Sequence, residues 1–317
     1  MSRRLQTHLV TRQLLLCPIR IRKGACLETP ILSLVTDWDI PWGMTSILVL
    51  VSITYVRGWG ALRRTRPKTL PTWRLIAFLS GMTSLFVAIA SPFDTFSERL
   101  LFMHMAQHFV LMSVAPPLIV MGSPIVPILR GMPGWIIRKI GGPMFRSVAL
   151  RKLRHRLDGL GVAWLSMNLA YVCWHIPRAY EFALSSEGWH NVEHLCFFLT
   201  SILFWWPIVL PWPSRRRFET WILIPYLLTA DLVNTAVSAL LCFSGRLLYP
   251  SYAFVERPFG VTPLTDQIAA GALMWVCGSI IFLMPAAVLT MRSLTSRRLV
   301  QPAYSTERPI SRWFSAG

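Results

Sequence analysis

The sequence has few of the features that mark several common functional classes. None of its six cysteines forms a C-x-x-C pair, so neither a thiolate metal motif nor a disulfide framework is evident. It contains no G-x-x-x-x-G-K-[ST] loop and no G-x-G-x-x-G fingerprint, and therefore nothing indicates a nucleotide-driven pump. Acidic residues are also scarce: 14 Asp and Glu stand against 32 Lys and Arg, which gives a net charge of +18.

Apolar residues, in contrast, are abundant and lie in long runs. They make up 54% of the chain, and the mean hydropathy is +0.49. Seven segments approach the length of about 20 residues that spans the hydrocarbon core of a bilayer; they are 41–57, 72–91, 100–120, 158–175, 190–210, 220–243 and 268–291. The pattern predicts an all-α fold, a polytopic transmembrane helix bundle of about seven spans in a lipid bilayer. The apolar stretch 124–137 contains Pro127 and Pro133, so we expect it to be interfacial or part of a long loop.

The basic residues lie mainly in alternate gaps between these runs. The gaps 57–74, 121–158 and 211–220, together with the C-terminal tail, hold 22 Lys and Arg, whereas the other gaps hold four. The positive-inside rule therefore predicts an N-terminus outside and a cytoplasmic C-terminus. Because the positive charge follows this rule, we expect no nucleic acid as a partner.

The charge pattern also suggests how the chain divides. We expect a transmembrane helical domain at 38–292 and a cytoplasmic tail at 293–317. Residues 1–37 are basic, although the predicted orientation places them outside. We interpret them as an N-terminal extension of doubtful structure, either beyond a wrongly assigned start codon or disordered; an eighth membrane-associated segment is the third interpretation.

Five histidines lie at the predicted outer ends of three spans. His104 and His108 fall in the first turns of the third span, His175 ends the fourth, and His190 and His194 open the fifth. Imidazoles inside a span are costly and usually mark function. The predicted topology brings all five to one depth in the outer leaflet, which favours a metal or haem site. Interhelical hydrogen bonding is the alternative.

Helical spacing adds candidate ligands beside these histidines. His104 and His108 are four residues apart and share one helix face with Met105 and Met112. Imidazole suits copper, zinc and iron, whereas thioether sulfur favours Cu(I). On the fifth span, Glu193 belongs to the same polar stripe as the histidine pair. The donors alone therefore leave copper, zinc and iron open, and haem is the less favoured cofactor.

Other polar residues have more than one interpretation. Asp231 lies midway along the sixth span and either pairs with a neighbouring polar group or belongs to an ion or proton path. Asp266 and Gln267 open the last span, where a carboxylate either attracts a cation or is an ordinary solvated loop residue. Gly271 and Gly278 share a face of that span, which predicts close packing against another helix.

The segment His190-Asn-Val-Glu-His194 matches H-x-x-E-H, the inverted zincin pattern. In such enzymes two histidines bind zinc and the glutamate activates water. Five residues are a weak match, and a third ligand and access for a substrate would be needed. We therefore do not expect a metalloprotease, and we predict that the protein is not an enzyme.

Several motifs in the same order resemble one known family. The residues that carry the resemblance are His104-Met-Ala-Gln-His108, Ala115-Pro-Pro-Leu, Gly122-Ser-Pro, Trp174-His-Ile-Pro, Tyr180, Ala183, His190-Asn-Val-Glu-His194, Phe204-Trp-Trp-Pro207, Asp266-Gln267, Gly271 and Met274-Trp-Val-Cys-Gly278. From about Trp38 to about Arg292 the chain resembles the multi-span caa3-type cytochrome c oxidase assembly factors, often called CtaG. Cys277 departs from that pattern, where proline is more usual.

The resemblance implies a multi-pass protein of the bacterial plasma (inner) membrane that helps to mature haem–copper oxidases through copper. Its partners would be cytochrome c oxidase subunits or copper chaperones. The histidines then suggest a mechanism in which the outer-leaflet cluster holds copper transiently and hands it on. The alternatives are a copper or other metal transporter, a haem protein and a metal-free scaffold.

Overall fold

A computed structural model describes residues 40–65, 70–141, 147–148, 159–214, 218–257 and 260–300. These residues all belong to one structural unit, Asp37–Gly317, so the predicted N-terminal extension lies outside the described part of the chain. The described residues are helical wherever they are regular, and they contain no strand. The predicted all-α fold is therefore confirmed.

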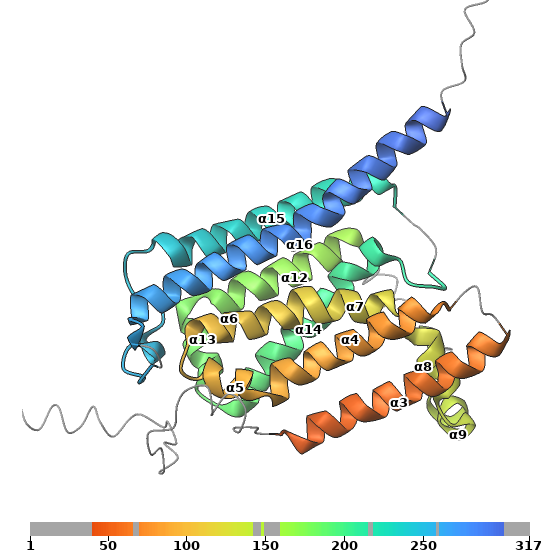
Figure 1. The fold of residues 1–317 in the computed structure, drawn as a ribbon, viewed down its shortest axis with the longest axis horizontal. Coiled ribbons are helices and arrows are strands. Elements are labelled where there is room, and N and C mark those ends of the chain that lie inside the picture. Colours follow the sequence, from red (N-terminus) through yellow and green to blue (C-terminus); the bar gives the residue numbers. More distant parts are fainter. Residues whose placement is uncertain are drawn as a thin grey trace, which may run out of the picture. The chain divides into compact units, whose positions relative to one another are not determined.

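The longer helices lie side by side in one bundle (Figure 1). In chain order, the elements are α3 (Trp42–Thr65), α4 (Thr72–Ala90), α5 (Pro92–Ser97), α6 (Leu101–Phe109), η2 (Val110–Val114), α7 (Ala115–Met121), α8 (Ile125–Gly131), α9 (Gly134–Ile136), η3 (Ile137–Gly141), α12 (Leu160–His175), α13 (Pro177–Leu184), α14 (Glu187–Val209), α15 (Thr220–Phe243), η4 (Pro250–Tyr252) and α16 (Pro263–Val300).

Within the described residues, six helical stretches are long and apolar enough to cross a membrane: Trp42–Thr65, Thr72–Ala90, Leu101–Met121, Glu187–Val209, Thr220–Phe243 and Pro263–Thr295. This agrees closely with the prediction of about seven spans. The remaining predicted span, 158–175, corresponds to α12, which has only 16 residues. Pro177 explains its end, because a residue before proline is disfavoured in the helical region, and Ile176 is extended with ψ 128°. The stretch 124–137 forms the short helices α8 and α9.

A π-helical segment, η2, interrupts the third of these stretches between α6 and α7. Pro116 has no N–H, so it cannot donate to the carbonyl of Met112 four residues earlier. That carbonyl instead accepts a hydrogen bond from Nε1 of Trp205 at 3.1 Å, while the N–H of Ala115 bonds to the carbonyl of Val110. The prolines thus cause a local widening of the helix, of the kind often found at functional sites.

Buried apolar side chains form two clusters. One cluster lies among α3, α4, η2 and α7 and includes the stacked rings of Tyr55 and Phe78. The other lies among α6, α12, α13, α14, α15 and α16 and includes the fully buried rings of Tyr180, Phe197 and Phe204. The second cluster surrounds the polar residues that the sequence analysis singled out.

Glycines allow two pairs of helices to approach closely. A Cβ atom at Gly278 of α16 would lie 2.5 Å from Nδ2 of Asn234 on α15, and one at Gly271 would lie 2.9 Å from the carbonyl oxygen of Ser238. This confirms the close packing expected from Gly271 and Gly278. Between α3 and α8, a Cβ at Gly58 would lie only 1.7 Å from the carbonyl oxygen of Pro127.

We predict that Gly58→Ala destabilises the fold, whereas Gly60→Ala on the same helix does not. The Gly58 methyl would overlap a backbone atom, and such overpacking costs about 1–3 kcal/mol. A Cβ at Gly60 meets no atom within 4 Å, so alanine there gains about 1 kcal/mol of helix propensity. Thermal unfolding of both variants in detergent checks this, and equal melting temperatures would contradict the close contact between α3 and α8.

Candidate metal centre

Four histidines from two helices converge on one point inside the bundle. His104 and His108 lie one turn apart on α6, and His190 and His194 lie one turn apart on α14. One ring nitrogen from each can be chosen so that all four nitrogens lie within 4.8 Å of one another. We call these four residues the histidine cluster. Bonds of about 2.0–2.1 Å to a tetrahedral ion would place the nitrogens about 3.3 Å apart, so small side-chain rotations would complete a four-nitrogen shell.

Three of the rings are buried, the fourth is half-buried, and their Nε2 atoms have no hydrogen-bond partner among the described residues. His104, His108 and His194 are 1%, 3% and 6% exposed, and His190 is half-buried. Within the described residues, none of the four Nε2 atoms makes a hydrogen bond. Buried polar atoms are almost always hydrogen-bonded, because leaving one unpaired costs about 1–3 kcal/mol. Four histidine rings that gather their nitrogens within 4.8 Å and leave Nε2 unpaired therefore favour an ion as the missing partner.

A hydrogen-bond network sets the tautomer of one cluster histidine. The hydroxyl of Tyr252 lies 2.7 Å from the carbonyl oxygen of Ser97 and 3.2 Å from Nδ1 of His104. Burial raises the pKa of Tyr252, so this hydroxyl keeps its single proton, which it donates to Ser97. His104 must therefore donate from Nδ1, which leaves a lone pair on Nε2 for a metal.

Glu193 adds a carboxylate to the wall of the cluster. Its side chain is fully buried, and neither oxygen accepts a hydrogen bond from a described residue. Its Oε1 lies 3.8 Å from Nε2 of His108. A carboxylate in this position can offset the charge of a bound cation, which is expensive to hold in a low-dielectric interior.

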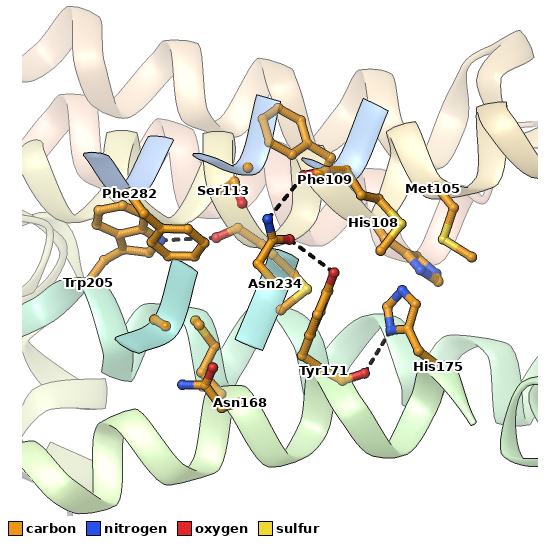
Figure 2. Close-up of a pocket in the computed structure, with 15 residues that line it drawn as sticks. Met105, His108, Phe109, Ser113, Asn168, Tyr171, His175, Trp205, Asn234 and Phe282 are labelled. Atoms are coloured by element: carbon orange, nitrogen blue, oxygen red, sulfur yellow. Dashed lines mark hydrogen bonds between the residues drawn. The ribbon is translucent and has the colours of Figure 1, made fainter. Parts of the chain in front are cut away.

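His175 lies next to the histidine cluster but outside it. Its ring centroid is 6.2 Å from that of His108, and its Nδ1 lies 2.7 Å from the carbonyl oxygen of Tyr171 (Figure 2). Met105 and Met112, predicted as supporting ligands, are buried beside His108 on the wall of a neighbouring cavity. The structure thus brings four of the five predicted histidines into one group and places the fifth at this cavity.

Asp266 and Gln267 have structural contacts that the sequence did not predict. Asp266 is 2% exposed, and its carboxylate accepts hydrogen bonds from the backbone N–H groups of Leu101 and Phe102 at 2.8 and 3.0 Å. It therefore caps the start of α6 and is not a solvated loop residue. Gln267 is fully buried and accepts a hydrogen bond from the N–H of Leu248. Asp231 accepts a hydrogen bond from the hydroxyl of Ser279 at 2.9 Å. Of the two interpretations of Asp231, this contact matches pairing with a neighbouring polar group.

Tyr252 contacts the histidine cluster but was not predicted from the sequence. It lies in η4, between two spans, in the segment Tyr249-Pro-Ser-Tyr252. Both tyrosines are buried, and Tyr249 donates to the carbonyl oxygen of His175 at 2.9 Å. The pattern that could have drawn attention to them is a pair of tyrosines one helical turn apart in a gap between spans. Nothing in the sequence shows which helix they contact.

The fold and the site define a multi-pass helical membrane protein with a buried histidine cluster. Residues 53–296 match the family described as cytochrome c oxidase caa3 assembly factor (Caa3_CtaG). The chain belongs to this family, and the resemblance seen in the sequence is confirmed.

Similar curated proteins come from mycobacteria. An uncharacterized protein of Mycobacterium leprae is 24% identical over 253 residues, which cover 76% of this chain and 37% of the relative. Uncharacterized proteins of Mycobacterium bovis and Mycobacterium tuberculosis are each 26% identical over 279 residues, covering 81% of this chain and 40% of theirs. The chain thus spans about two fifths of the length of these relatives. No solved structure shows significant similarity to it.

We predict that Tyr252→Phe weakens metal binding at the histidine cluster about 10–100-fold, the usual effect of losing a partner that orients a histidine ligand. Without the hydroxyl, His104 loses the acceptor that holds its Nδ1 proton. Tyr249→Phe is the matched control, because that hydroxyl bonds only to a backbone carbonyl outside the cluster. Competition titrations with Zn(II) measure both affinities, and equal affinities would contradict the role assigned to Tyr252.

Proposed function

We propose that this protein assists the assembly of a haem–copper cytochrome c oxidase by binding copper at the histidine cluster and passing it on. The observation that carries the proposal is that ring nitrogens of four histidines from α6 and α14 lie within 4.8 Å of one another. Each of these rings also has a buried Nε2 without a hydrogen-bond partner in the described structure. Membership of the cytochrome c oxidase assembly family connects this donor set to copper. Imidazole is a good ligand for copper in either oxidation state.

The proposed location is the bacterial inner membrane, with the histidine cluster towards the outside. The cluster lies in the first turns of the span Leu101–Met121 and near the start of α14, so both spans present it at the same end of the bundle. The basic gaps between spans lie at the opposite ends of these helices in the sequence. By the positive-inside rule the cluster then faces the non-cytoplasmic side, where oxidase subunits and copper chaperones are its proposed partners.

The geometry favours a carrier over an enzyme or a haem protein. Four histidine ligands fill a tetrahedral shell and leave no open position, whereas catalytic zinc sites keep one for water or substrate. The cross-helix pairs of cluster rings are 5.1–6.4 Å apart between centroids, and the two rings on each helix are 4.1–4.3 Å apart. The four imidazoles thus pack against one another around one point, as ligands of a single ion would. The family match gives no indication of a reaction at this site.

We predict that His190→Ala/His194→Ala abolishes copper binding at the cluster and lowers the copper content and activity of the oxidase in cells. Removing two of four ligands leaves a two-coordinate remnant. Copper per chain is measured by elemental analysis of the purified protein, and oxidase activity is measured in membranes. The matched control is Asn191→Ala on the same turn of α14, a residue outside the cluster.

The results separate the proposed function from its alternatives. Normal oxidase copper in cells that produce the double variant at wild-type levels would overturn the carrier role. If wild-type vesicles accumulate labelled copper and the double variant does not, the protein is a transporter. Copper-free wild-type protein that remains copper-free after loading would leave only a scaffold role.

A further inference from the structure

A second candidate site lies inside the bundle next to the histidine cluster. It is a cavity of about 40 Å³ between α6, η2, α12, α14, α15 and α16, and one water molecule needs about 10–15 Å³ (Figure 2). His108 lies on its wall and belongs to the histidine cluster as well. The cavity therefore adjoins the cluster through a shared residue, and it has room for a small ion.

Four methionine side chains line this cavity. Met105, Met112, Met167 and Met274 come from α6, η2, α12 and α16, and each is at most 7% exposed. The π-helical turn carries Met112, whose position therefore depends on the local widening caused by the prolines. The lining contains no Asp, Glu, Lys or Arg. Thioether sulfur is a soft ligand that selects Cu(I) over zinc and over hard cations.

His175 supplies a nitrogen lone pair to the same cavity. Its Nδ1 faces a carbonyl oxygen, which can only accept, so the proton of the neutral ring lies on Nδ1. Its Nε2 then carries a lone pair, is buried, and has no partner in the described structure. Figure 2 shows this nitrogen on the side of the ring that faces His108.

Other polar groups of the wall satisfy one another. The hydroxyl of Tyr171 donates to Oδ1 of Asn234 at 3.0 Å, and Nδ2 of Asn234 donates to the carbonyl oxygen of Met274 at 3.2 Å. These bonds hold α12, α15 and α16 together around the cavity. The thioethers, Nε2 of His175 and the ring nitrogens of His108 have no such partner among the described residues, and only His108 is shared with the histidine cluster.

We propose that this cavity is a second metal site, which holds Cu(I) through methionine thioethers and Nε2 of His175. This second site goes beyond the proposed function, which needs only the histidine cluster. The second site still rests on that function, because copper would reach the cavity past His108. Neutral ligands favour an ion with a single charge, because each additional buried charge adds to the desolvation cost. The protein then carries two copper ions with different ligand sets.

The test uses the full-length protein in detergent and Ag(I), a soft monovalent probe that cannot change oxidation state under these conditions. We expect the wild type to bind two Ag(I) per chain, and Met167→Leu/Met274→Leu and His190→Ala/His194→Ala to bind one each. Methionine-to-leucine changes nearly conserve volume, so the fold should persist. Met82→Leu, a buried methionine of α4 outside the cavity, is the matched control and should bind two.

Two further readouts identify the ligands. Zn(II) should bind once to the wild type, and the methionine variant should leave that binding unchanged. X-ray absorption of Cu(I) bound to His190→Ala/His194→Ala should show sulfur neighbours, which a site made of imidazoles alone cannot give.

The outcomes distinguish this proposal from the function on which it rests. One Ag(I) in the wild type, lost in the histidine variant and kept in the methionine variant, overturns the second site and leaves the histidine cluster intact. Two Ag(I) that persist in the methionine variant also overturn it, and water then fills the cavity. No Ag(I) in the folded wild type overturns both proposals.

Discussion

The burial of histidine nitrogens without protein partners is the constraint on which the site depends. Five Nε2 atoms, from the four cluster histidines and His175, lie inside the bundle with no hydrogen bond in the described structure. A helix bundle that needed these residues only for packing would pair them with hydroxyls or carbonyls, as it does for Tyr171 and Asn234. The unpaired nitrogens are therefore a cost in stability that a bound cation removes.

Contacts far from the histidines keep them in register. The carboxylate of Asp266, on α16, fixes the first turn of α6 three residues before His104. At the other end of α6, Nε1 of Trp205 holds the π-helical turn through the carbonyl of Met112. Helices α14 and α16 thus set where α6 begins and how it widens. A rigid support of this kind is what a metal site requires of the surrounding protein.

The sequence was sufficient to predict the cluster because topology alone brings its members together. His104 and His108 open one span, and His190 and His194 open another that starts on the same side. Residues at matching ends of neighbouring spans share a depth in the membrane whatever the detailed packing. His175 lies beside this group and not in it, because depth does not determine which face of α12 meets the cluster.

The features that the sequence could not predict depend on three-dimensional contacts. The role of Asp266 as a cap depends on a contact between residues 165 positions apart. The length of α12 depends on where Gly159 and Pro177 end the helix, and boundaries are the least certain part of a sequence-based assignment. The cavity needs five helices in their correct rotations, and one of them contains a π-turn. Periodicity fixes the faces of a regular helix but not those beyond such a turn.

The charges around the two regions give them different preferences for an ion. An ion in the histidine cluster would lie near the buried carboxylate of Glu193, which is 3.8 Å from Nε2 of His108. An ion in the cavity would have only neutral neighbours. Since a buried charge is costly unless it is paired, the cluster accepts a divalent ion more readily than the cavity does. The carboxylate would therefore favour a divalent ion in the cluster, and the thioethers would favour a soft monovalent ion in the cavity. His108 lies between the two regions.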